Sequence, residues 1–142
     1  MTKNRKKAGS AGEGRPVTSG RDRKQPLYKS FGYAFEGIIH TIQKERNMQI
    51  HCCAAVLVTA FGLWLGLSRE EWFVCLILFG MVMSLECVNT AIEAVVDLAT
   101  TQRHPLAKKA KDAAAGAVLI AAIFAAIIGL WIFLPKILLR IG

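Results

Sequence analysis

The sequence predicts an all-α integral membrane protein with three transmembrane helices and an N-terminal amphipathic helix that lies at the membrane interface. Two observations predict this class. The 142 residues are 54% hydrophobic although the formal net charge is +8, and the apolar residues concentrate in three long stretches. The hydrocarbon core of a bilayer requires roughly 20 apolar residues of helix, and a short soluble chain could not bury three such helices.

We predict transmembrane helices at residues 48–67, 72–97 and 112–134. The first contains no charged residue, and the third contains only Asp112 at its start. Small residues predict close helix packing in two of them: Gly62 and Gly66 form a GxxxG motif, and the third span is rich in alanine. Both packing within the chain and self-association of copies fit this pattern.

The residues before the first span divide into a tail and a helix. Residues 1–26 are basic and contain few large apolar side chains, so we expect a disordered tail that lies near anionic lipid and does not bind nucleic acid. In residues 27–44, apolar side chains recur every three or four positions with polar ones between them. This pattern predicts a surface helix whose apolar stripe enters the interface. Residues 27–142 then form a single membrane domain.

The orientation follows from the positive charges. Fifteen of the 18 Lys and Arg residues lie in the first 29 residues, just before the first span, or in residues 98–112. Because positive charge concentrates on the cytoplasmic side, we predict a multi-pass protein of the cytoplasmic membrane with its N-terminus in the cytoplasm. The polar segments then face the compartment that contains ATP.

The second span carries polar side chains on one helix face, at steps of three, four and four residues: Glu86, Asn89, Glu93 and Asp97. An ionised carboxylate in hydrocarbon costs roughly 2.5–3.5 kcal/mol, so such residues need a partner or a task. Carboxylates suit Mg²⁺, and lysines follow that could bind the phosphates of a nucleotide. From the spacing alone, phosphoryl transfer, ion or proton transport, and structural pairing with Lys111 all remain open.

Longer motifs narrow these alternatives. The runs ECVNTAIEAVVD (Glu86–Asp97) and HPLAKKAKDAAAGAVL (His104–Leu119) resemble the prokaryotic diacylglycerol kinase family, and its undecaprenol kinase branch most closely. ERNMQIH (Glu45–His51) and KSFGYAFEGI (Lys29–Ile38) extend the resemblance to residues 27–135. It implies a homotrimer whose active sites are shared between neighbouring subunits, with three transmembrane helices and one interfacial helix per subunit.

The resemblance also implies a role for each polar residue in the motifs. Glu86 corresponds to the general base that accepts the proton of the lipid hydroxyl, and Asn89 to an amide that orients the base or a phosphate oxygen. Glu45 and Glu93 correspond to the pair that holds Mg²⁺. The expected contacts with ATP fall at Tyr33, Asp97, Arg103, His104, Lys111 and Asp112.

The prediction is therefore an ATP- and Mg²⁺-dependent lipid kinase that phosphorylates the hydroxyl of undecaprenol. Diacylglycerol is the alternative substrate, and a small transporter or channel is the alternative from another class. His104 has a second interpretation as a helix cap, and His51 is interpreted as a packing residue. The chain departs from the family at Pro26, where some members have an arginine; Arg21, Arg23 or Lys24 could replace it.

Overall fold

The computed structural model describes residues 26–142, so residues 1–25 of the predicted tail lie outside the described residues. The described chain consists of four helices: α1 (Leu27–Lys44), α2 (Arg46–Leu65), α3 (Arg69–Ala99) and α4 (Pro105–Ile141). The last three are long and apolar enough to cross a membrane. The predicted all-α membrane class is confirmed, and the chain is a multi-pass membrane protein.

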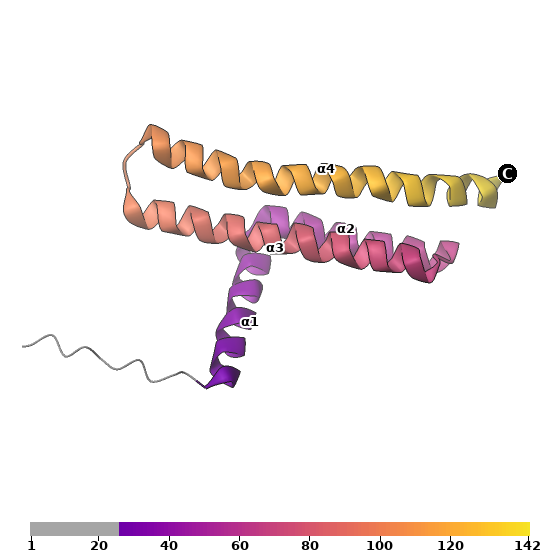
Figure 1. The fold of residues 1–142 in the computed structure, drawn as a ribbon, viewed down its shortest axis with the longest axis horizontal. Helices are drawn as coiled ribbons and strands as arrows, with labels where there is room; N and C mark the ends of the chain where they lie inside the picture. The colour runs from indigo at the N-terminus through magenta and orange to yellow at the C-terminus, as the bar shows by residue number, and fades with distance from the viewer. Residues whose placement is uncertain (1–25) are drawn as a thin grey trace, which may run out of the picture.

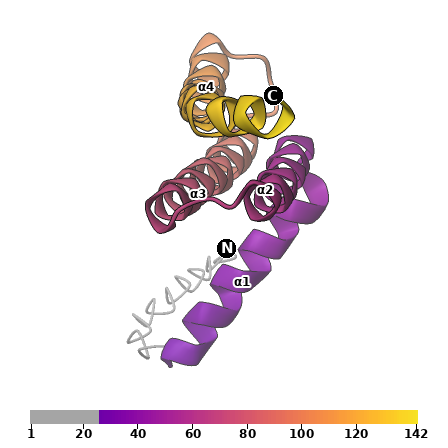
Figure 2. The same ribbon diagram turned by 90° about the vertical axis from the view of Figure 1, so that its right-hand side faces the viewer.

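A one-residue break at Glu45 separates α1 from α2. Glu45 takes an extended conformation (φ −93°, ψ 117°) while its N–H still donates to the Thr41 carbonyl at 2.9 Å. The chain changes direction there, so α1 projects away from the bundle of the other three helices (Figures 1 and 2). Glu45 is half-buried at this corner, where α1 meets the bundle.

The turn between α2 and α3 uses both glycines of the GxxxG motif within the chain. Gly66 ends α2 in the left-handed conformation (φ 68°), which favours glycine. A Cβ at Gly62 would lie 2.9 Å from the Trp72 ring of α3. Ser68 then starts α3 with a capping box, because its hydroxyl accepts from the Glu71 N–H and its own N–H donates to the Glu71 carboxylate. The sequence left open whether the GxxxG motif serves packing within the chain or self-association. In this structure it serves packing within the chain.

Helices α3 and α4 lie side by side along most of their length (Figure 1). Both extend beyond the predicted spans of residues 72–97 and 112–134. With a rise of about 1.5 Å per residue, the 31 residues of α3 and the 37 of α4 reach about 46 and 55 Å, against a hydrocarbon core of about 30 Å. The ends of both helices therefore stand in the polar region of the membrane or beyond it.

Little of the apolar surface is buried within one chain. Of the most apolar 18-residue stretch of each long helix, only 11–22% is buried within the chain. The buried apolar side chains form a thin line between the helices: Met48, Leu67, Cys75, Leu78, Val82, Ala114, Val118 and Ala121. The outward apolar faces are suited to lipid or to other copies of the chain.

Candidate functional site

The interior face of α3 holds a buried carboxylate without a partner. Glu86 is only 1% exposed, and neither of its carboxylate oxygens has a hydrogen-bond partner among residues 26–142. Buried polar atoms are almost always paired, because leaving them unpaired costs free energy. An unpaired and buried carboxylate is therefore the group in the described chain that most requires a functional explanation.

One helical turn further along, an amide links the carboxylates of this face. Asn89 is 4% exposed, and its side-chain N–H donates to Glu93 Oε1 at 3.2 Å. Asn89 Oδ1 is buried and has no partner among the described residues. The structure thus places Glu86, Asn89 and Glu93 on one helix face, as their spacing predicted. Three buried oxygen atoms on this face have no partner among the described residues, so they are free to accept hydrogen bonds or to coordinate a cation.

The beginning of α2 adds further polar groups to this face. Glu45, Asn47 and His51 all approach the Glu86 carboxylate, although none of them makes a hydrogen bond of good geometry with its oxygens. His51 is half-buried, and it lines two cavities, one among α2, α3 and α4 and one between α2 and α4. Nothing in its spacing distinguished His51 from a packing residue. The signal that identifies it is the three-dimensional approach of α2 to Glu86.

Structural pairing with Lys111 accounts for only part of the acidic face. Lys111 Nζ lies 2.6 Å from Asp97 Oδ1. This ion pair joins α3 to α4 and does not involve Glu86. The structural-pairing alternative therefore explains Asp97 but not the most deeply buried carboxylate.

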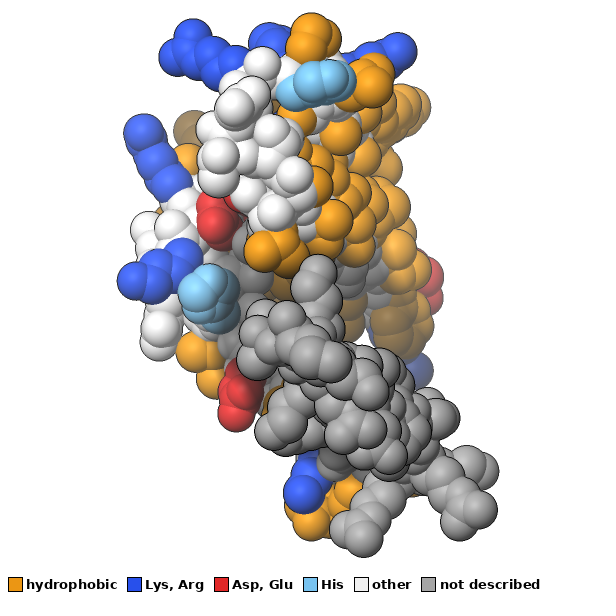
Figure 3. All heavy atoms as spheres, turned by 90° about the vertical axis from the view of Figure 1, so that its left-hand side faces the viewer, with side chains coloured by type: hydrophobic (Ala, Val, Ile, Leu, Met, Phe, Trp, Pro, Cys, Tyr) orange, Lys and Arg blue, Asp and Glu red, His pale blue; other side chains and the backbone are white. Residues whose placement is uncertain are grey.

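A polar pocket lies where α3 turns into α4. It has a volume of about 850 Å³, and it is lined by the end of α3, the connecting residues and the first turns of α4. The end of the molecule that carries this turn displays Lys, Arg, Asp, Glu and His side chains, with hydrophobic side chains along one flank (Figure 3). Five of the six residues predicted to contact ATP line the pocket: Asp97, Arg103, His104, Lys111 and Asp112.

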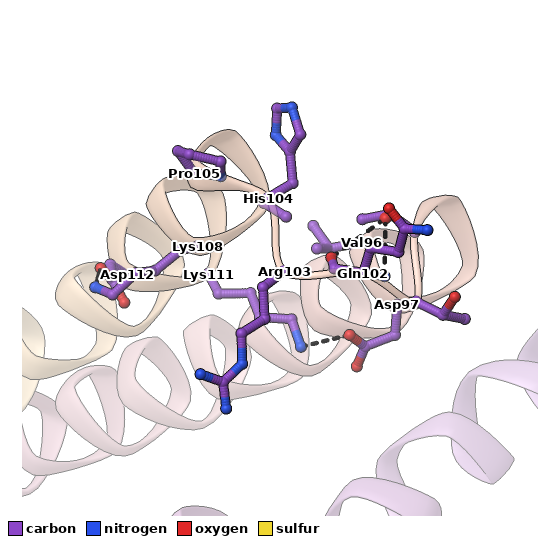
Figure 4. Close-up of a pocket in the computed structure, with 12 residues that line it drawn as sticks. Val96, Asp97, Gln102, Arg103, His104, Pro105, Lys108, Lys111 and Asp112 are labelled. Carbon is purple, nitrogen blue, oxygen red and sulfur yellow. Dashed lines mark hydrogen bonds and ion pairs between the residues drawn. The ribbon is translucent and has the colours of Figure 1, made fainter.

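The side chains around this pocket differ in direction. The Arg103 guanidinium lies on the same side as the Lys111–Asp97 pair, whereas the His104 ring points to the opposite side (Figure 4). His104 Nδ1 accepts from the Leu106 N–H at 3.2 Å and caps α4, so its second interpretation as a cap is seen in the structure. Asp112 pairs with Lys108 one turn away in the same helix. Lys111 and Arg103 therefore present two cationic groups on the same side of the pocket.

Tyr33 is the one predicted ATP contact that stands apart from this pocket. It lies on α1, is 60% exposed, and is not among the residues that line the pocket. With α1 in this position, a contact of Tyr33 with a nucleotide bound at the α3–α4 turn would need either another copy of the chain or a movement of α1.

The donor atoms of the acidic face fit Mg²⁺. In the described residues no three His, Cys, Asp or Glu side chains gather as a metal site. Mg²⁺ does not require such a cage, because it is commonly held by one or two carboxylates together with substrate phosphates and water. Glu45 and Glu93, both half-buried beside Glu86, supply oxygen donors of that kind.

The two polar regions are arranged along one helix. Glu86 and Asp97 are eleven residues apart on α3, or about 16 Å along the axis at 1.5 Å per residue. Glu93 lies between them. A ligand bound at the α3–α4 turn would have to extend over this distance along α3 to reach the buried carboxylate.

Comparisons with known proteins agree with this arrangement. The family model for prokaryotic diacylglycerol kinase matches residues 32–133. An undecaprenol kinase of Bacillus subtilis (strain 168) is 50% identical over 117 residues, which cover 82% of this chain and 95% of that protein. A diacylglycerol kinase of Synechocystis sp. is 44% identical over 113 residues, 79% of this chain and 65% of that protein. A diacylglycerol kinase of Escherichia coli (strain K12) is 33% identical over 101 residues, 71% of this chain and 83% of that protein. As its motifs predicted, the chain belongs to the prokaryotic diacylglycerol kinase family.

Proposed function

We propose that this protein transfers the γ-phosphoryl group of ATP to the hydroxyl of undecaprenol, with Mg²⁺, at the cytoplasmic face of the cell membrane. Membership of the family makes the chain a lipid kinase. The observation that supports the chemistry best is Glu86, a buried carboxylate whose two oxygens have no partner within the described chain.

The choice of lipid rests on sequence similarity. The Bacillus subtilis relative, which is named an undecaprenol kinase, matches nearly its whole length to this chain. The two relatives named diacylglycerol kinases are less identical to this chain, at 44% and 33%. Diacylglycerol is therefore the second candidate, and both lipids present a hydroxyl group at the membrane surface.

Glu86 acts as the general base in this proposal. Its carboxylate accepts the proton of the lipid hydroxyl as the hydroxyl oxygen bonds to the γ-phosphorus, and the bond from that phosphorus to the bridging oxygen breaks to release ADP. Because no partner among residues 26–142 occupies the carboxylate oxygens, they are free to meet the substrate. Asn89 fixes the position of the neighbouring Glu93 through its hydrogen bond.

The charges around the reacting groups come from both ends of the site. Lys111 and Arg103 bind the phosphates, and Asp97 holds the Lys111 ammonium in place at 2.6 Å. Glu45 and Glu93 would hold Mg²⁺, which when bound supplies positive charge against the phosphate oxygens. Phosphoryl transfer depends mainly on such positioning and charge stabilisation.

The assembly and orientation complete the proposal. The basic segments support an orientation with the N-terminus and the α3–α4 turn in the cytoplasm, where ATP is present. The protein works as a homotrimer, which would cover part of the apolar surface that one chain leaves open. In that assembly Tyr33 of one subunit contributes to the nucleotide pocket of another.

The test is the Glu86→Gln variant, assayed in detergent micelles with radiolabelled ATP and with undecaprenol and diacylglycerol in parallel. Gln keeps the size of the side chain and removes the base, so product formation should fall by about a hundredfold or more. Glu70→Gln, at an exposed position in the first turn of α3, is the control and should keep full activity. A Glu86→Gln protein that forms product at the normal rate would sink the proposal. A transporter would form no phosphorylated lipid in either form.

A further inference from the structure

Helices α2, α3 and α4 enclose an apolar cavity on the membrane side of the buried carboxylate. Its volume is about 200 Å³, and His51 is the only polar side chain among the residues that line it. On α3 the lining runs from Cys75 to Met83. Val82, also in the lining, lies one helical turn before Glu86.

The cavity and the nucleotide pocket lie on opposite sides of Glu86 along α3. The apolar lining on α3 ends at Met83, Glu86 follows, and the polar pocket begins at Val96. A lipid alcohol whose hydroxyl reaches Glu86 cannot lay its hydrocarbon chain toward the phosphate-binding end. Its first apolar units must extend the other way, toward the bilayer interior, where the cavity lies.

We propose that this cavity holds the first isoprenoid units of the substrate chain and that small residues of α4 set its width. This inference rests on the proposed function and names the part of the chain that selects the lipid. His51 lines the cavity and also approaches the Glu86 carboxylate, so it connects the apolar cavity with the site of the hydroxyl.

The α4 wall is built from small residues. They recur at steps of three, one and three residues and so share one helix face: Ala122, Ala125, Ala126 and Gly129. A Cβ added at Gly129 would meet no atom within 4 Å, so the wall leaves free space there. An isoprenoid chain carries methyl branches and is wider than a straight acyl chain. Side chains without bulk at these positions therefore favour the branched substrate.

The experiment narrows the cavity from α4 and compares two substrates. In Ala125→Leu the added carbons enter the cavity, and a single methylene in an apolar pocket already changes selectivity by roughly 10-fold or more. The ratio of kcat/KM for undecaprenol to that for diacylglycerol should fall at least about tenfold. Gly129→Ala should move the ratio the same way by less, and it favours folding because Ala is the better helix former. Ala117→Leu, at an exposed position of α4 outside the cavity, should leave the ratio unchanged.

The outcomes separate this inference from the proposed function. A wild-type protein that does not phosphorylate undecaprenol refutes the proposed function itself. An active wild type together with Ala125→Leu and Gly129→Ala proteins of unchanged ratio refutes the cavity as the isoprenoid site. If Ala125→Leu instead alters the oligomer size on gel filtration while Gly129→Ala keeps the normal ratio, the cavity is a subunit contact and the inference fails.

Discussion

At the scale of single residues, the acidic face is costly unless a ligand completes it. A charged carboxylate at the centre of a membrane helix costs roughly 2.5–3.5 kcal/mol on insertion scales. Glu93 recovers part of such a cost through Asn89, whereas Asp97 lies at the exposed polar end of α3 and pairs with Lys111. Glu86 has neither kind of partner in the described chain. Its burial is understandable if substrate and a divalent ion arrive beside it.

The variant Glu93→Gln separates metal binding from structure at this face. The Gln side chain keeps an oxygen that can accept from Asn89, so the hydrogen bond of 3.2 Å can persist while the negative charge is lost. We expect the Mg²⁺ concentration for half-maximal activity to rise roughly 10- to 100-fold, with thermal stability near that of the wild type. A Mg²⁺ titration of ATP turnover measures this. A normal titration in Glu93→Gln would remove Glu93 from the metal site, and Glu70→Gln is the matched control.

The residues of the site were predictable to different degrees. The face with Glu86, Asn89 and Glu93 follows from helical spacing alone, because positions three and four apart share a face. The pairing of Lys111 with Asp97 depends on how α3 packs against α4. The place of His51 beside Glu86 depends on the approach of α2. Because contacts between helices are not encoded by a local period, sequence reasoning left the pairing with Lys111 as one open alternative and could not place His51 beside Glu86.

At the scale of elements, α3 and α4 are longer than the apolar runs that predicted them. Hydropathy ends a span at the first charged residues, but the helical backbone continues while its hydrogen bonds are satisfied. Pro105 begins α4 seven residues before Asp112, because proline suits the first helical position and His104 caps the helix. The extra turns carry the polar pocket out of the hydrocarbon region. Element types were thus predictable, and their ends depended on capping.

Replacing two glycines of these helices by alanine should change the free energy of unfolding in opposite directions. Gly66 ends α2 at φ 68°, a region that costs other residues about 1–2 kcal/mol. Gly66→Ala should therefore destabilise the protein by about 1 kcal/mol. Gly80 lies inside α3 and a Cβ there would meet nothing within 4 Å, so Gly80→Ala should stabilise by up to about 1 kcal/mol. Unfolding by SDS in mixed micelles, followed by circular dichroism, measures both. Equal shifts of the same sign would contradict the role of Gly66.

At the scale of the whole molecule, one chain leaves its surfaces and its site incomplete. Most of the apolar surface of the long helices faces outward. Helix α1 projects from the bundle (Figure 2), and Tyr33 on it does not line the pocket of its own chain. Both features are explained if neighbouring subunits pack together and α1 reaches the nucleotide pocket of the next one.

Mixing two impaired variants tests this shared site. Tyr33→Ala damages the part supplied by α1, and Lys111→Ala damages the α3–α4 pocket, so each protein alone should have little activity. When both chains are co-expressed in equal amounts, they mix in the trimers. A site is intact when its pocket comes from a Tyr33→Ala subunit and its Tyr33 from a neighbouring Lys111→Ala subunit, which occurs by chance at about a quarter of the sites. Turnover of ATP with undecaprenol should recover to about that fraction of the wild-type rate.

The control pair places both defects in one pocket. Asp97 and Lys111 form an ion pair at 2.6 Å within the same chain, so a mixture of Asp97→Ala and Lys111→Ala subunits contains no pocket with both residues and should stay inactive. Full activity of Tyr33→Ala alone would remove Tyr33 from the site. If Tyr33→Ala is impaired but its mixture with Lys111→Ala recovers nothing, each active site is built within a single subunit, and α1 must then reach its own α3–α4 turn by moving from the position it has here.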